Sequence, residues 1–532
     1  MKMTRLRLAA SALFLILVVV FCACDSATKR SLAPLGNNKV PPAIQALALA
    51  LTRSLESQGY EVAQGYMKLF TIADCACAIA ATGQCFGNNP TAPYVIPFVP
   101  AWPEEYIDPT TVDVFGENPD DFLSIRRFDP REATLVFGVM PPPARYFGFQ
   151  SYQYTREGTV DTTNTVYQTM AALFPFMLDR FFGPAPSGRL FSFSSISNNS
   201  NNVVFERQAG SFFNQVRCFI ITPDQAMDAA VRKALAQYGV SGRDILTEPI
   251  APPVTVGLEK EADDFMSLIR YSLPENQEEG DQWRQDLPLV VLRVRDPRGD
   301  RAPEPWPEFL HPQQRFDTSE LYLSNDLNAL NNNVRAAWAL GPAPNPPGAN
   351  DRMLDLQRVY PIDLVGPDCI RNTMNCLGDT QDTSYAMSSN LPLEDGNGGK
   401  FLYAIAGTLG TRTGNATYTA LSIYRALVST GVDNVDDRQL TQSQQVFPQG
   451  PNPFGNQDKL YLWYIGRSCA AVPEGNCTEI SEDEVPLGES MKLTIRNYIR
   501  PGDVRGPNTE PAGDPKGISP LLTAWVTTIA LP

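Results

Sequence analysis

The sequence predicts an α+β fold, dominated by antiparallel β-sheets with several packed helices. Hydrophobic residues make up 43% of the 532 residues, enough to bury a sizeable core. Many short segments alternate apolar and polar residues, the pattern of strands in antiparallel sheets. The 46 prolines and 37 glycines indicate frequent turns between these strands.

The chain starts with basic residues followed by an apolar run. Lys2, Arg5 and Arg7 precede residues 8–21, which are apolar apart from Ser11. This order is typical of a secretory signal peptide. The run is shorter than the roughly 18 residues that a permanent transmembrane helix needs. Export is therefore expected, and an uncleaved anchor is the weaker alternative.

The end of this leader carries a second pattern. The segment Phe21-Cys22-Ala23-Cys24 resembles the lipobox of bacterial lipoproteins, in which the cysteine after a small residue is acylated. The resemblance implies that residues 1–23 are removed and that Cys24 carries a lipid. It also implies a membrane partner, with the chain facing the periplasm or the cell exterior. Plain cleavage without lipid is the alternative.

The cysteines after the leader support an oxidising compartment, because their number is even. They are Cys75, Cys77, Cys85, Cys218, Cys369, Cys376, Cys469 and Cys477. Short loop-like stretches separate Cys369 from Cys376 and Cys469 from Cys477, so these two pairs are predicted disulfides. Among the other four, one bridge is expected to reach Cys218. A zinc site is the alternative, although Cys75-x-Cys77 lacks the usual ligand spacing.

The N-terminal elements follow from local signals. Residues 24–42 read as a tether because they hold three prolines and little apolar content. A helix is expected next, ending at Gly59, because Ile44, Leu47, Leu51 and Leu55 share one face. Residues 92–109 contain five prolines among bulky apolar residues, so they are expected to be extended.

Residues 131–156 read as a strand, a proline corner and a second strand. On the second strand Tyr146, Tyr152 and Tyr154 share one face and phenylalanines share the other. Ligand stacking is one interpretation of these tyrosines. Core packing is the favoured one, because both faces carry rings that need to be covered.

Capping signals and periodicity define the middle of the chain. Residues 190–196, 216–221 and 288–295 are predicted strands. Thr222 is the expected N-cap of a helix that ends at Gly239, because proline and Gln225 follow it in a capping-box order. A further helix is predicted over residues 258–270.

A domain boundary is expected near residue 341. A helix is predicted from Ser324 to a stop at Gly341, and the proline-rich residues 341–350 read as a linker. The predicted division is therefore an α+β domain over residues 43–340 and a β-rich domain over residues 351–532.

The C-terminal part reads as strands at residues 401–408, 416–424, 459–466 and 491–499. In the last of these, Met491, Leu493 and Ile495 alternate with polar residues, which predicts one buried face and one face toward water. Residues 521–531 are expected to dock back onto the fold.

Two segments share the spacing Ala-x-Tyr-x5-Tyr. The first copy holds Ala144, Tyr146 and Tyr152, and the second starts at Ala416. The strands 288–295 and 491–499 likewise both end in arginine before a Pro/Gly turn. These patterns suggest two related β-rich halves, with coincidence as the equal alternative.

The sequence excludes several kinds of chemistry. His311, in a proline-flanked loop, is the one histidine, so two-histidine metal motifs are excluded and a catalytic triad would depend on His311. There is no phosphate-binding glycine loop and no Gly-x-Ser-x-Gly turn. The net charge of −15 disfavours nucleic acid as a partner.

No cofactor is predicted, with calcium as the alternative. The loops at residues 378–382 and 394–398 place Asp379, Asp382 and Asp395 near tight turns, where carboxylates serve either a cation or the turn itself. Neither loop matches the twelve-residue calcium motif.

The function that we predict is a lipid-anchored envelope protein that binds or scaffolds without catalysis, with an envelope protein or a glycan as partner. The alternative is a secreted hydrolase that uses two carboxylates on a polysaccharide or similar polymer. A cleft with two acidic side chains roughly 5 to 10 Å apart would favour the hydrolase.

Overall fold

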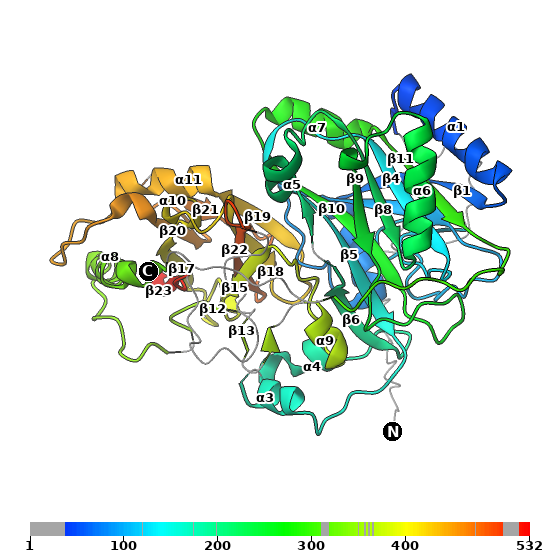
Figure 1. The fold of residues 1–532 in the computed structure, drawn as a ribbon. Coiled ribbons are helices and arrows are strands. Elements are labelled where there is room, and N and C mark those ends of the chain that lie inside the picture. Colours follow the sequence, from blue (N-terminus) through cyan, green and yellow to red (C-terminus); the bar gives the residue numbers. More distant parts are fainter. Residues whose placement is uncertain are drawn as a thin grey trace, which may run out of the picture.

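The computed structural model describes residues 38–531, apart from residues 120, 174, 198, 310–318, 349, 356–357, 360–361, 364–365, 474 and 504–520. Cys24 and His311 therefore lie outside the described residues. Within the described ranges, no helix is long and apolar enough to cross a membrane. The fold is a mixed α+β fold rich in antiparallel sheets, as predicted (Figure 1).

The N-terminal part is built on one eleven-stranded sheet with the main order β6-β5-β10-β2-β1-β11-β4-β8-β9. Its strands are β1 (Glu61–Phe70), β2 (Tyr94–Pro100), β3 (Phe122–Leu123), β4 (Glu132–Val139), β5 (Ala144–Arg156), β6 (Leu190–Ser195), β7 (Ser200–Asn201), β8 (Val216–Thr222), β9 (Ile245–Pro249), β10 (Phe265–Pro274) and β11 (Leu289–Arg295). Its helices are α1 (Pro42–Ser57), α2 (Cys75–Thr82), α3 (Thr165–Leu173), α4 (Leu178–Phe182), α5 (Asn202–Ala209), α6 (Gln225–Gln237) and α7 (Gln277–Asp286).

Helices α1 and α6 cover one face of this sheet, at the right of Figure 1. Leu51 and Leu55 of α1 and Val231 and Leu235 of α6 are fully buried there. In α1 the spacing of four residues belongs to the apolar stripe that predicted the helix, whereas α6 was predicted from its capping signals. Helix α6 begins later than expected, because Asp224 accepts the Ala226 amide at 3.3 Å as the N-cap.

The predicted helix over residues 258–270 is wrong, because residues 258–264 form turns, bends and irregular backbone and residues 265–270 belong to β10. Strand β10 lies between β5 and β2 in the interior of the sheet. Phe265 and Ile269 pack on one face and Met266 and Leu268 on the other. A strand covered on both faces loses the apolar–polar alternation by which strands are recognised.

The C-terminal part contains two sheets packed face to face. The six-stranded sheet has the main order β12-β15-β22-β18-β19 and the four-stranded sheet the order β21-β20-β17-β23. The strands are β12 (Leu354–Asp355), β13 (Arg358–Val359), β14 (Ile362–Asp363), β15 (Thr383–Met387), β16 (Leu391–Pro392), β17 (Lys400–Thr408), β18 (Thr419–Arg425), β19 (Gly431–Asp436), β20 (Leu460–Gly466), β21 (Cys477–Glu479), β22 (Ser490–Tyr498) and β23 (Trp525–Leu531). The helices are α8 (Ser324–Ala337), α9 (Pro367–Arg371), α10 (Gly410–Thr413) and α11 (Asp437–Gln442).

Helix α8 packs on the outer face of the four-stranded sheet. Leu327, Leu330 and Val334 are fully buried against residues of β17, β20 and β23. The predicted division assigns α8 to the N-terminal part, but its apolar face lies on the C-terminal sheet. The proline-rich residues 341–350 follow this helix rather than separating the two large sheets.

The two parts meet through the outer face of the six-stranded sheet. Tyr146 of β5 and Tyr418 next to β18 both contact the ring of Tyr498, with centroid distances of 4.4 and 5.1 Å. All three rings are at most 2% exposed. This tyrosine seam fixes the N-terminal sheet against the C-terminal one.

The cysteines form disulfides, as expected of an oxidised chain. The bridges Cys369–Cys376 and Cys469–Cys477 confirm the two predicted pairs, and Cys75 pairs with Cys85. Cys77 is also disulfide-bonded. The predicted bridge to Cys218 is wrong, because this residue is a free thiol on β8, buried under α1 and α6.

Cys218 should resist alkylation in the folded protein. Its side chain is 2% exposed, and burial raises the pKa of its thiol to about 12, so thiolate is scarce. Iodoacetamide is expected to leave Cys218 unmodified under native conditions and to modify it in guanidinium without reductant. Peptide mass spectrometry measures both. Rapid modification of native Cys218 would contradict this placement.

Candidate functional site

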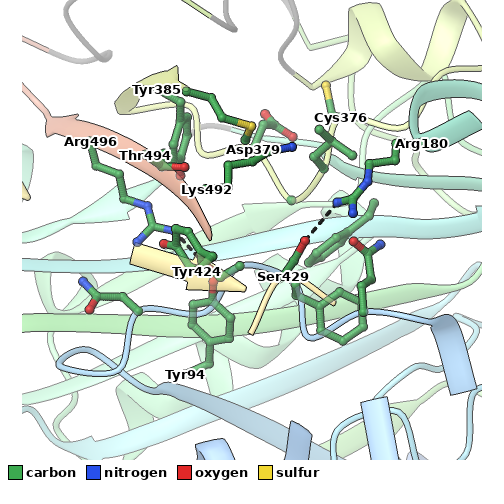
Figure 2. Close-up of a pocket in the computed structure, with 18 of the residues that line it drawn as sticks. Tyr94, Arg180, Cys376, Asp379, Tyr385, Tyr424, Ser429, Lys492, Thr494 and Arg496 are labelled. Atoms are coloured by element: carbon green, nitrogen blue, oxygen red, sulfur yellow. Dashed lines mark hydrogen bonds between the residues drawn. The ribbon is translucent and has the colours of Figure 1, made fainter. Parts of the chain in front are cut away.

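A cavity of about 120 Å³ lies between the outer face of the six-stranded sheet and the N-terminal sheet (Figure 2). One water needs roughly 10–15 Å³, so this space admits a small organic molecule. We call it the central cavity. Its lining residues are Gln84, Phe86, Gly87, Asn89, Ala92, Tyr94, Met177, Arg180, Phe181, Phe193, Arg270, Cys376, Leu377, Gly378, Asp379, Tyr385, Met387, Tyr424, Arg425, Ser429, Lys492, Thr494, Arg496 and Tyr498.

One wall is a face of three neighbouring strands. On β22, Lys492, Thr494 and Arg496 alternate with Met491, Leu493 and Ile495, which are buried on the other face between the two C-terminal sheets. The neighbours of β22 add Tyr385 from β15 and Tyr424 from β18. The alternation that predicted one polar face is therefore correct. That face does not meet open water, because the N-terminal part covers it.

The opposite wall comes from the N-terminal sheet and the segments that cross it. Arg270 of β10 lies with its guanidinium over the rings of Tyr94 and Tyr152, at 5.3 and 5.7 Å. Its Nη1 donates to the Tyr152 hydroxyl at 2.6 Å. Arg180 extends from α4 into the cavity, and its Nη1 donates to Ser429 Oγ at 2.9 Å (Figure 2).

Arg270 and Arg496 occupy equivalent positions in two strand ladders that share the same register. Gly148 of β5 is the register partner of Arg270, and Ala420 of β18 is the register partner of Arg496. Four residues further along β18, Tyr424 lies 5.5 Å from the Arg496 guanidinium, just as Tyr152 of β5 lies beneath Arg270.

This match refines the repeat seen in the sequence. The counterpart of β22 is β10, whereas the sequence pattern paired it with the strand that is now β11. The spacing Ala-x-Tyr-x5-Tyr therefore marks two ladders of the same register, one on each side of the central cavity.

The central cavity carries an excess of positive charge. Five cations line it: Arg180, Arg270, Arg425, Lys492 and Arg496. Asp379 is the one carboxylate among the lining residues. Glu489 pairs with Arg425 at 2.7 Å, and Asp382 lies behind the wall, so three carboxylates face five cations. The chain as a whole carries a net charge of −15, so the cavity departs from its surroundings.

Within the part of the chain that the structure describes, Arg425 is the only one of these five cations that forms an ion pair. Arg270 and Arg496 are 4% and 7% exposed, yet among the described residues no carboxylate lies within 4.0 Å of either. Arg496 donates to Ser422 Oγ at 3.0 Å and to the Gly87 carbonyl at 2.7 Å. These neutral acceptors satisfy hydrogen bonds and leave the charge uncompensated.

Elsewhere in this protein, carboxylates neutralise the charge of a buried arginine. Arg293, in the N-terminal core, donates to Glu105 and Glu132 at 2.6 Å, and all three side chains are fully buried. Arg126 lies nearby without a hydrogen bond to its guanidinium, but the same two glutamates act on it through space. Two cations and two carboxylates thus balance there. At the central cavity Asp379 and Asp382 likewise act through space on Arg270, but five cations outnumber the three carboxylates.

Lys492 is the least satisfied cation of the site. Its ammonium makes no hydrogen bond or ion pair with the part of the chain that the structure describes. Burial, together with the charge of Arg180, lowers the pKa of Lys492 to about 8. The register partner of Lys492 is Tyr424, which lines the same wall. An amine in this position is expected to find its partner in a ligand.

Asp379 lines the central cavity and accepts hydrogen bonds from backbone amides and a hydroxyl. Its carboxylate accepts from the amides of Ser195 and Gly366 at 2.8 and 3.0 Å and from Ser195 Oγ at 2.5 Å. Burial raises the pKa of Asp379 to about 6, since desolvation outweighs these hydrogen bonds. Asp379 is therefore a group that titrates near neutral pH inside the site.

The structure places the three predicted carboxylates in separate settings. Asp382 accepts from the Tyr146 hydroxyl at 3.0 Å and from Asn201 Nδ2 at 3.0 Å. Asp395 forms a turn, accepting from the amides of Asn397 and Gly399. Within the described ranges no group of three acidic, histidine or cysteine side chains is placed to hold a metal ion.

The predicted stacking tyrosines are core residues. Tyr146, Tyr152 and Tyr154 are at most 1% exposed, and none of them lines the central cavity. Of the aromatic residues that do line it, Tyr424 belongs to the second copy of the Ala-x-Tyr-x5-Tyr spacing, whereas others, such as Tyr385, were not singled out in the sequence. Arg270 was missed because it lay in the predicted helix, although a lone arginine in an apolar run was the signal to follow.

Replacing Lys492 by methionine should stabilise the folded protein. The folded pKa of Lys492 lies below the ordinary 10.5, so its charge destabilises the fold at pH 7. After a discount for partial exposure, we expect a gain of about 1–2 kcal/mol in the free energy of unfolding. Urea unfolding measures this gain, which should shrink as the pH rises from about 8 toward 10.5.

The matched control is Lys233→Met, which removes the same charge from an exposed position on α6. It should change stability by less than about 0.5 kcal/mol. A loss of stability in Lys492→Met would show that the ammonium has a stabilising partner.

Comparisons with known proteins add no functional information about the site. No family model matches the chain, and no curated protein matches its sequence. One structural comparison is with an uncharacterized protein from Burkholderia cenocepacia, with a TM-score of 0.35 and 9% identity. The similarity covers 92% of this chain and 96% of the other.

Proposed function

We propose that this chain is an exported, lipid-anchored binding protein that takes up a small organic anion in the central cavity. The observation that carries the proposal is the set of cavity-lining cations without ion pairs among the described residues, above all the buried Arg270 and Arg496 and the half-buried Lys492. Burying a charge without a counterion is costly, so such a set suits a ligand that supplies the negative charge.

The remaining lining residues favour an organic acid over a bare inorganic ion. Phe86, Phe181, Phe193 and the thioether side chains of Met177 and Met387 give the cavity apolar surface. Ligand sites generally combine such surface with a few polar groups that orient the ligand. A carboxylate or phosphate attached to a compact apolar or aromatic body fits this combination.

Export and lipidation rest on the leader. Its basic start, apolar run and lipobox-like cysteine support removal of residues 1–23 and acylation of Cys24. The disulfides support an oxidising compartment. The two-carboxylate hydrolase gains no support at the central cavity, whose lining holds one carboxylate among the described residues.

Isothermal titration calorimetry with the mature protein tests the proposal. Benzoate, succinate and inorganic phosphate serve as anionic probes, and benzylamine is the matched cation. At least one organic anion is expected to bind, and benzylamine is not. Lys492→Met should weaken binding about tenfold or more, equivalent to about 1.4 kcal/mol.

The control is again Lys233→Met, which should bind as the unaltered protein does, since α6 lies far from the cavity lining. Absence of binding by every anion, or equal affinity in Lys492→Met, would refute the proposal.

Anion affinity should fall as the pH rises from about 5 to 9. Asp379 loses its proton near pH 6 and adds negative charge, and Lys492 loses its proton near pH 8 and removes positive charge. The lining arginines stay charged throughout. Benzoate stays ionised over this range, so calorimetry with benzoate isolates the protein groups. We expect about a tenfold loss in total, and a rise of affinity with pH would contradict this charge balance.

A further inference from the structure

The amine of Lys492 lies in an unusual position for a lysine. It lines an internal cavity, faces its cross-strand neighbour Tyr424, and has no hydrogen bond or ion pair within the described ranges. We infer that Lys492 captures carbonyl compounds as a reversible imine, and that the ligand class is therefore an oxo acid. This inference rests on the proposed function, since it names the ligand of the same site.

The first requirement of imine formation is an uncharged amine. Burial is the larger cause of a lowered pKa here, because it disfavours the charged form of Lys492. The charge of Arg180, which shares the cavity with Lys492 (Figure 2), acts in the same direction, and together these two effects lower the pKa of Lys492 to about 8. At pH 7 the free amine is then roughly 300 times more abundant than for an ordinary lysine.

The second requirement is a group that holds the carbonyl compound beside the amine. Lys492 and Arg496 lie on the same face of β22, separated by Thr494. A guanidinium binds a carboxylate through two parallel hydrogen bonds, so Arg496 or Arg180 can fix the acid end of the molecule. The carbonyl carbon of an oxo acid fixed in this way lies within the cavity that Lys492 lines.

The reaction is balanced without an oxidant or a reductant. The lone pair of Lys492 Nζ forms a bond to the carbonyl carbon, and the C=O π electrons move to oxygen. The two protons of the amine leave with that oxygen as water, and a C=N bond remains. Water reverses the reaction, so the ligand is released unchanged.

Reductive trapping tests the inference. The mature protein is incubated at pH 7 with pyruvate and sodium cyanoborohydride, which reduces an imine to a stable secondary amine, and the modified lysines are located by peptide mass spectrometry. Lys492 should be modified at least about tenfold faster than Lys233, and excess benzoate should slow it. Acetone, which lacks the carboxylate, should modify Lys492 more slowly than pyruvate.

Lys492→Arg keeps the charge and removes the nucleophile, so it should abolish the adduct at position 492. Modification of Lys492 no faster than that of Lys233 would overturn the inference. If anions still bind in calorimetry, the failure belongs to the imine alone and the proposed function stands. If neither binding nor trapping occurs, both are refuted.

Discussion

The central constraint of this molecule is positive charge enclosed between two sheets. Arg270 and Arg496 are almost fully buried, and the groups in direct contact with them are tyrosine rings, two hydroxyls and carbonyl oxygens, while Asp379 and Asp382 act on Arg270 only through space. Such contacts orient a guanidinium but do not neutralise it. The chain uses carboxylates freely elsewhere, as around Arg293, so the difference is local to the cavity.

Two ladders of equal register create this arrangement. Each places an arginine above a tyrosine of the neighbouring strand, and Tyr498 joins the two ladders by contacting Tyr146 and Tyr418. Tyrosines at different positions of the ladders serve two purposes. Tyr146, Tyr418 and Tyr498 form the seam between the halves, and the rings of Tyr152 and Tyr424 lie against the arginine charges. The position of Lys492 is taken by Met266 in the other ladder, so only one ladder presents an amine.

Sequence reasoning succeeded where one pattern had one physical cause. Alternation identified β22 and its polar face, and capping signals identified α6 within a few residues. It failed at β10, where both faces are buried and alternation vanishes, and at the cavity, whose walls come from strands far apart in the sequence. The alternation of Lys492, Thr494 and Arg496 reveals a polar face, but only the packing of the other half shows what covers it.

The hydrogen bond from Arg496 to the Gly87 carbonyl joins positions 409 residues apart. Gly87 is synthesised long before Arg496, so the cavity closes only once β22 has been made. A chain that stops before β22 lacks an entire wall of the site. Under the proposed function, capture of the ligand therefore begins only after β22 has folded against the N-terminal part.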